Sequence, residues 1–244
     1  MHVGSANLCR TPPTTLEFAS LTDAGLVRSH NQDCHVTDAR AGFAILAHGM
    51  GGMGGQNAGE VASELAVAQL SSRLRAQGGA MLAPEGLRKL VEQANAAIYY
   101  MARHREHCAG MGATMVAALF RPGTMLVAHV GDARLYRLRG ARFEALTPDE
   151  ACLSQGNHMV TRALGVGASV EVTVAVHATQ PHDVYLLCSN GLNDMTGDDA
   201  IEQVLRAHPG DLAAAAFGLV GLANGNGGRD NVTVILARWI KPAA

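Results

Sequence analysis

The chain has 244 residues, of which 48% are hydrophobic and 16% charged, with a net charge of −2. This composition provides a sizeable core and excludes a disordered chain, and the charge gives no basic surplus for binding nucleic acid or an anionic membrane. Five cysteines without a C-x-x-C pair argue against a zinc site and a disulfide framework, so we expect a reducing, cytoplasmic location. The apolar runs are too short to predict a membrane span.

The elements follow one another within a single predicted domain over residues 16–240, after a flexible lead-in over 1–15 that carries Pro12 and Pro13. Apolar and β-branched stretches predict strands at 16–21, 43–47, 113–120, 125–130, 134–139, 142–146, 170–177, 183–188 and 231–239. Helical spacing of apolar residues predicts helices at 58–77, 84–107, 198–207 and 211–223.

Short turns join several of these strands, at Pro122-Gly123 and at Arg139-Gly140-Ala141. Short connections favour antiparallel pairing, because parallel strands need long crossovers. Strands gathered in blocks, with helices inserted between the blocks, indicate an α+β layered fold rather than strict βαβ alternation.

A glycine-rich segment over 47–55 follows one predicted strand and precedes a predicted helix. It lacks the G-K-[ST] ending of a Walker A loop and the βαβ context of a dinucleotide fingerprint. Two interpretations stay open for the glycines alone: a loop whose backbone approaches a phosphate closely, or a flexible connection.

Acidic and amide side chains recur at the predicted strand ends, usually beside glycine. Asp33, Asp132, Asn190 and Asp230 occupy such places. Each alone is typical of a turn or a cap. Together, oxygen-rich groups at sheet edges suit hard cations such as Mg²⁺ or Mn²⁺.

The ordered motifs identify a resemblance. The chain carries T-D-x-G-x-V-R-S-x-N-x-D, A-x-G-M-G-G, G-M-G-A-T, A-H-V-G-D-A-R-L-Y-R-L, L-T-P-D, T-R-A-L-G, S-x-G-L-x-D and G-G-R-D-N-V-T-V, in this order. This set resembles the bacterial metal-dependent protein phosphatases of the PPM, or type 2C, serine/threonine family, over nearly the whole chain. The resemblance implies an α-β-β-α sandwich, with two mostly antiparallel sheets flanked by helices and a metal cleft between the sheet ends.

The resemblance also implies roles for particular residues. Arg28 matches the residue that clamps the substrate phosphate, for which a guanidinium offers two parallel donors. The implied metal-site residues, for two or three Mn²⁺ or Mg²⁺ ions, are Asp33, His48, Gly49 through its carbonyl, Asp132, Asn190 and Asp230. In the family a metal-bridging water attacks phosphorus in line.

Three positions depart from the family pattern. His48 stands where the motif A-D-G-M-G-G has the bridging aspartate, Asn190 where S-D-G-L has an aspartate, and Gln32 where N-E-D has a glutamate. The two nitrogens of an imidazole diverge, so His48 cannot bridge two ions ~3.5–4 Å apart and is expected to bind one. With less negative charge, Mn²⁺ or Zn²⁺ becomes more plausible relative to Mg²⁺.

These departures leave alternatives open. The leading hypothesis is a protein phosphatase that hydrolyses phosphoserine and phosphothreonine, as a monomer, against a cognate serine/threonine kinase. The alternative is an inactive pseudophosphatase that binds phosphoproteins, and a third possibility is that the changes were engineered.

The short segment between Asp149 and Thr161 predicts a small flap and an open cleft. This compact form resembles phosphatases that accompany a kinase in type VI secretion clusters.

Overall fold

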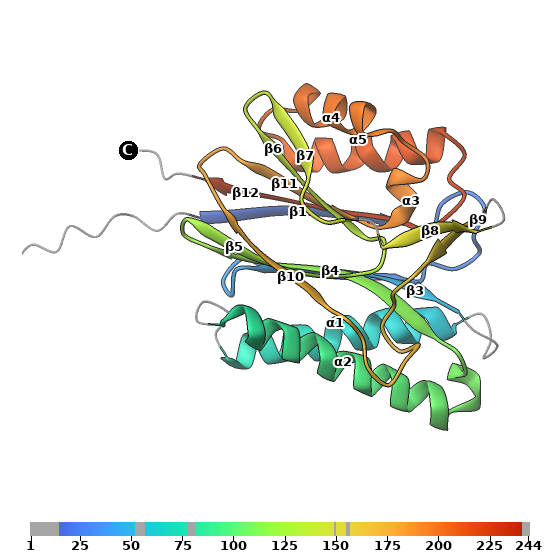
Figure 1. Cartoon of the computed structure of the whole chain (residues 1–244). Helices are drawn as coiled ribbons and strands as arrows, with labels where there is room; N and C mark the ends of the chain where they lie inside the picture. Colours follow the sequence, from blue (N-terminus) through green and yellow to red (C-terminus); the bar gives the residue numbers. More distant parts are fainter. Residues whose placement is uncertain (1–14, 52–56, 78–81, 149, 155–156, 241–244) are drawn as a thin grey trace, which may run out of the picture.

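The computed structural model describes residues 15–51, 57–77, 82–148, 150–154 and 157–240. Two five-stranded antiparallel sheets lie face to face, and helices cover the outer face of each (Figure 1). The predicted α-β-β-α sandwich is therefore confirmed. The predicted lead-in falls outside the described residues except for Thr15, where the first strand begins. Among the described residues, no helix is long and apolar enough to cross a membrane.

The first sheet contains both ends of the described chain. Its strand order is β1 (Thr15–Asp23), β12 (Val232–Ile240), β11 (Val184–Cys188), β6 (Arg134–Arg139) and β7 (Arg142–Ala145). Its outer face carries α3 (Asn190–Asn193), α4 (Asp198–Ala207) and α5 (Leu212–Gly225) (Figure 1). The outer sheet face and these helices form an apolar cluster that includes Leu186, Leu219 and Val234.

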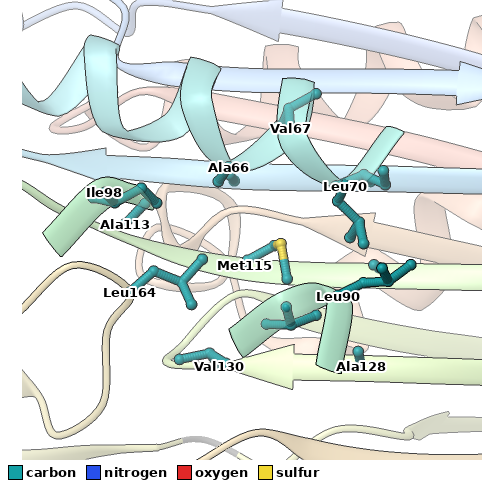
Figure 2. Packing of buried hydrophobic residues seen from close by; sticks show 14 of the residues in the cluster. Ala66, Val67, Leu70, Leu90, Ile98, Ala113, Met115, Ala128, Val130 and Leu164 are labelled. Carbon is teal, nitrogen blue, oxygen red and sulfur yellow. The ribbon is translucent and has the colours of Figure 1, made fainter. Parts of the chain in front are cut away.

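The second sheet has the strand order β10 (Thr173–Ala178), β5 (Thr124–Val130), β4 (Gly112–Arg121), β3 (Phe43–Met50) and β2 (Asp33–Asp38). Its outer face is covered by α1 (Ala58–Gln77) and α2 (Pro84–His104). Figure 2 shows this contact from close by: Leu70 of α1 and Leu90 of α2 lie over Met115 of β4.

The central strands are apolar on both faces because each face is buried. In β3, Phe43, Ile45 and Ala47 belong to the cluster under the helices, whereas Ala44 and Leu46 belong to the cluster between the sheets. Such alternation between two buried layers explains why β3 and β4 read as continuous apolar runs.

The predicted ends are confirmed for α1, α4 and β6, the other predicted elements appear with shifted ends, and four strands or α-helices were not predicted. The helix predicted at 84–107 ends at His104, and a 3₁₀ turn covers Glu106–Cys108. The additional elements are β2, α3 and the hairpin of β8 (Ala151–Ser154) and β9 (Asn157–Val160). Strand β2 has the polar sequence DCHVTD and lies at a sheet edge, so no alternation of apolar residues marked it.

Candidate active site

A pocket of about 390 Å³ opens where the ends of the two sheets meet. From the second sheet and its connections come Gln32, His48, Gly49 and Asp132, and from the first come Asn190 and Asp230. Its lining is Arg28, Gln32, His48, Gly49, Met50, Gly51, Asp132, Val160, Asn190, Asp194 and Asp230. Six of the seven residues singled out from the sequence thus lie around one pocket, and Asp33 lies behind His48.

Arg28 lies in the connection between β1 and β2 and is held there by the chain just before β12. The amides of Leu26 and Val27 both donate to the carbonyl of Gly228, over 2.7 and 3.2 Å. Gly25 has φ +77, and a Cβ on it would lie 2.4 Å from the carbonyl oxygen of Asp230, so only glycine permits this close packing. The loop that carries Arg28 is therefore built against the loop that carries Asp230.

Arg28 and Asp230 form a two-point ion pair across these loops. Nε of Arg28 donates to one carboxylate oxygen over 3.0 Å and Nη2 to the other over 3.1 Å. The Arg28 side chain remains 58% exposed, so the guanidinium faces both Asp230 and the solvent at the pocket mouth. This is the fork geometry with which arginine also binds a phosphate.

Asn231 also holds the loop that carries Arg28, although the sequence assigned Asn231 no role. Its side-chain oxygen accepts from the amide of Gln32 over 2.9 Å, and its amide group donates to the carbonyls of Ala24 and His30. Asn231 thereby connects the last strand with both ends of the Arg28 loop. Its place beside Asp230 in the motif G-G-R-D-N-V was the available signal.

His48 and Asp33 are directly opposite each other in the register of β2 and β3. Nδ1 of His48 lies 2.6 Å from Oδ1 of Asp33, whose side chain is fully buried. Burial alone lowers the pKa of His48, but the charge and hydrogen bond of Asp33, helped by Asp230 and Asp132, raise that pKa to about 9. These acidic neighbours therefore favour positive charge at the His48 ring.

The other oxygen of Asp33 accepts from the opposite sheet. Oγ of Ser189 donates over 2.8 Å and Oγ1 of Thr233 over 2.6 Å. Ser189 in turn accepts from the amide of Thr233 over 2.9 Å. Ser189 and Thr233 lie within the ordered motifs, but the sequence assigned neither a role in the site, because their contact with Asp33 depends on how the two sheets pack.

Asp132 is held in a turn directly after β5. Gly131, the residue before Asp132, is clamped by Glu150, which is 8% exposed. The Glu150 side chain accepts from the Gly131 amide over 3.0 Å, and the Glu150 amide donates to the Gly131 carbonyl over 3.0 Å. Arg162 and Thr173 each donate to the other Glu150 oxygen over 2.8 Å. Glu150 is a further residue that the sequence did not reveal.

Gly49 and Asn190 are two uncharged residues that line the pocket. A Cβ at Gly49 would lie 2.0 Å from the carbonyl oxygen of Gly59, so the start of α1 packs directly on this backbone. Oδ1 of Asn190 is buried and has no hydrogen-bond partner among the described residues, while its Nδ2 donates to Asp194 over 3.4 Å. Residues 52–56 of the glycine-rich segment lie outside the described residues, and Gly51 lines the pocket.

The pocket offers the donor types that a divalent cation requires. Carboxylates of Asp132 and Asp230, the buried amide oxygen of Asn190 and the His48 ring face one cavity. In their present placement, no three His, Cys, Asp or Glu side chains of the described chain surround one point closely enough to hold an ion. The donor set therefore fits a cation by its chemistry, and the Arg28–Asp230 pair must open for Asp230 to join it.

Comparisons with known proteins agree with this arrangement. The family model described as Protein phosphatase 2C matches residues 27–213. The serine/threonine phosphatase stp of Listeria monocytogenes is 34% identical over 234 residues, which cover 88% of this chain and 92% of that protein. The serine/threonine protein phosphatase PstP of Mycobacterium tuberculosis is 36% identical over 239 residues, 91% of this chain and 45% of the longer relative.

Solved structures show the same likeness. The catalytic domain of PstP, in complex with two manganese ions, has a TM-score of 0.83 and 34% identity, covering 93% of this chain and 100% of that one. PppA, a regulatory component of the type VI secretion system in Pseudomonas aeruginosa, has a TM-score of 0.81 and 33% identity, covering 93% of this chain and 99% of that one. The chain therefore belongs to the protein phosphatase 2C family and is a metal-dependent serine/threonine protein phosphatase.

Proposed function

We propose that this phosphatase hydrolyses phosphoserine and phosphothreonine in proteins phosphorylated by a cognate serine/threonine kinase, with Mn²⁺ or Mg²⁺ bound in the pocket described above. The observation that carries the proposal is the convergence of Arg28, Asp132, Asn190 and Asp230 on one cavity from four separate parts of the chain. A guanidinium beside an oxygen-rich cluster is what a phosphate and its counter-cations require together.

Arg28 is the group that binds the phosphoryl oxygens. Its guanidinium is exposed at the pocket mouth and presents two parallel N–H donors. Arginine offers this fork to a carboxylate or a phosphate alike, so a phosphorylated side chain that enters the pocket replaces Asp230 as its partner. Asp230 is then released towards the interior of the pocket.

The cation donors are Asp132, Asp230, the side-chain oxygen of Asn190 and the carbonyl of Gly49. The orphaned buried oxygen of Asn190 supports this assignment, because a buried acceptor without a donor is costly unless a cation or water satisfies it. A bound divalent cation lowers the pKa of coordinated water and stabilises charge on the phosphoryl oxygens. Relative to Asp, the amide of Asn190 weakens the site for Mg²⁺, so Mn²⁺ is the better candidate.

The flap segment supports an accessible cleft. Residues 151–154 and 157–160 form the short hairpin β8–β9, and Val160 at its end lines the pocket. A small hairpin leaves room for a protein substrate.

We further propose that the phosphatase acts as a cytoplasmic monomer. Given its likeness to PppA, we also propose that it counters a kinase in the control of a secretion system.

The test uses purified full-length chain with p-nitrophenyl phosphate and with matched phosphoserine, phosphothreonine and phosphotyrosine peptides. We expect phosphate release that requires Mn²⁺, stops with a chelator and favours the first two peptides. Phosphopeptide binding without release, under saturating Mn²⁺, would instead support the pseudophosphatase alternative, which none of the relatives above favours.

A further inference from the structure

The Asp33 carboxylate accepts hydrogen bonds from three protein side chains. Oδ1 accepts from His48, and Oδ2 accepts from both Ser189 and Thr233, at distances between 2.6 and 2.8 Å. The side chain has no exposed surface and does not line the pocket. A cation in the pocket would therefore reach Asp33 as a direct ligand only if the His48 ring or the Asp33 side chain moved.

His48 is the group that Asp33 presents to the pocket. The ring is fixed through Nδ1, and the two imidazole nitrogens point in different directions, so Nε2 is directed away from Asp33. His48 lines the cavity with 10% of its side chain exposed, and within the described part of the chain Nε2 has no hydrogen-bond partner. Asp132 and Asp230, which line the same cavity, supply negative charge around it.

We propose that Nε2 of His48 is a nitrogen ligand of a divalent cation in this pocket and that Asp33 is a positioning residue outside the coordination sphere. The inference rests on the metal-dependent function proposed above. It assigns the arrangement in which a carboxylate binds one ring nitrogen and thereby orients the other towards a metal. Asp33 also fixes the tautomer, because its hydrogen bond keeps the ring proton on Nδ1.

This assignment changes the kind of site that the chain forms. One imidazole nitrogen binds one ion and cannot join two. The oxygens of Asp132, Asp230 and Asn190 complete a mixed nitrogen and oxygen set, which suits Mn²⁺ or Zn²⁺ better than Mg²⁺. We therefore expect one tightly bound ion per chain at the His48 position.

The experiment reads the ligand directly and does not depend on turnover. Full-length protein loaded with one equivalent of Mn²⁺ is measured by pulsed electron paramagnetic resonance. We expect a coupling to ¹⁴N from a directly bound imidazole, which changes to the ¹⁵N pattern when the protein is made with ¹⁵N-histidine. Because the isotope requires no substitution, this result cannot be confused with misfolding. His48→Gln is expected to remove the coupling, and His35→Gln, on the neighbouring edge strand, to retain it.

Asp33→Asn distinguishes the two roles of the carboxylate. If Asp33 acts through His48, this variant keeps the nitrogen coupling and binds Mn²⁺ about 10- to 100-fold more weakly in calorimetric titration. A wild-type protein that binds Mn²⁺ without nitrogen coupling, or that binds no Mn²⁺, would overturn the inference. Phosphate release measured on the same samples reports separately on the phosphatase function, so the first of these results leaves that function standing.

Discussion

The guanidinium of Arg28 holds both carboxylate oxygens of Asp230, although the two residues lie 202 positions apart. The same fork is needed by a substrate phosphate, and the same carboxylate by a cation. Substrate binding at Arg28 therefore releases Asp230, and cation binding at Asp230 releases Arg28. Because each ligand frees the partner of the other, the two are expected to bind with positive coupling, which is reciprocal by thermodynamic necessity.

Removing the Arg28 side chain separates its contribution to substrate binding from its competition with a cation for Asp230. Arg28→Ala is expected to lower kcat/KM for a phosphopeptide about 10- to 100-fold, since a charge-assisted hydrogen bond contributes about 1.5–3 kcal/mol. The same variant is expected to bind Mn²⁺ more tightly, because Asp230 no longer has a competing cation. Steady-state kinetics and calorimetric titration measure the two quantities. Arg28→Lys keeps the charge but not the two parallel donors, so its kcat/KM should lie between those of the wild type and Arg28→Ala. An unchanged kcat/KM in Arg28→Ala would contradict the role of Arg28 in phosphate binding.

Restoring carboxylates at the two departures tests how much they limit the reaction. His48→Asp combined with Asn190→Asp is expected to raise Mn²⁺-dependent hydrolysis of p-nitrophenyl phosphate by about two to three orders of magnitude, the scale on which one preorganised electrostatic group acts in an active site. Aspartate at 48 is able to bridge two ions, and aspartate at 190 adds one negative charge.

The single variants serve as controls, since each restores only one of these properties and should recover less. Elemental analysis is expected to find a second ion per chain in the double variant. Equal rates for the present sequence and the double variant would show that His48 and Asn190 are adequate as they stand.

Glu150 is expected to control the position of Asp132 without entering the pocket. Glu150→Ala keeps the backbone bond to Gly131 but removes the side-chain acceptor of the buried Gly131 amide and one partner of Arg162, so unfolding in urea should require about 1–3 kcal/mol less, the cost of an unsatisfied buried donor. Glu171 binds the second arm of Arg162 but is 72% exposed. Glu171→Ala is therefore the matched control, with a change within about 0.5 kcal/mol. Equal losses in the two variants would refute the clamp.

Asp183 gives the fold a defined response to acid. Burial raises the pKa of Asp183, but hydrogen bonds from Arg139, Tyr185 and the Gln180 amide outweigh burial and hold that pKa below its ordinary value of 3.8. Since the folded pKa is depressed, the stabilisation is complete above about pH 4 and is lost as the pH falls through the folded value. Asp183→Asn should lower the free energy of unfolding by about 3 kcal/mol at neutral pH, as for one partner of a buried pair.

The measurement is urea unfolding of both proteins between pH 3 and pH 7. The difference between wild type and Asp183→Asn is expected to stay constant above about pH 5 and to shrink below about pH 4. Glu106→Gln, at an exposed position, should show no such trend. A difference that is independent of pH down to pH 3 would contradict the assignment.

The apolar strands and long helices were predictable from the sequence because local pattern alone specifies them. Helix α1 and helix α4 have the predicted ends, since spacing and terminal residues agree along each. Strand β2 was missed because its residues are polar and half-buried at a sheet edge. Its pairing with β3, which brings Asp33 to His48, is a tertiary property and leaves no periodic signal.

The ordered motifs were enough to predict which residues lie together in the site. The hydrogen bonds that determine their roles were not. Ser189 and Thr233 reach Asp33 from 156 and 200 positions away, and nothing local distinguishes them from ordinary strand-end residues. Glu150 follows the motif L-T-P-D, yet its clamp on Gly131 depends on the turn that brings the two backbones together.

The contact of Asp33 with Ser189 and Thr233 is a polar bridge between two layers that share an apolar cluster. A ligand in the pocket consequently binds to both layers at once and favours only the state in which they are correctly packed. By mass action, an ion at 100 times its dissociation constant would raise the free energy of unfolding by about 2.7 kcal/mol. Cation affinity therefore depends on how well the two sheets pack. A cavity in the middle layer, for example in Leu187→Ala, is expected to weaken cation binding, although Leu187 does not line the pocket.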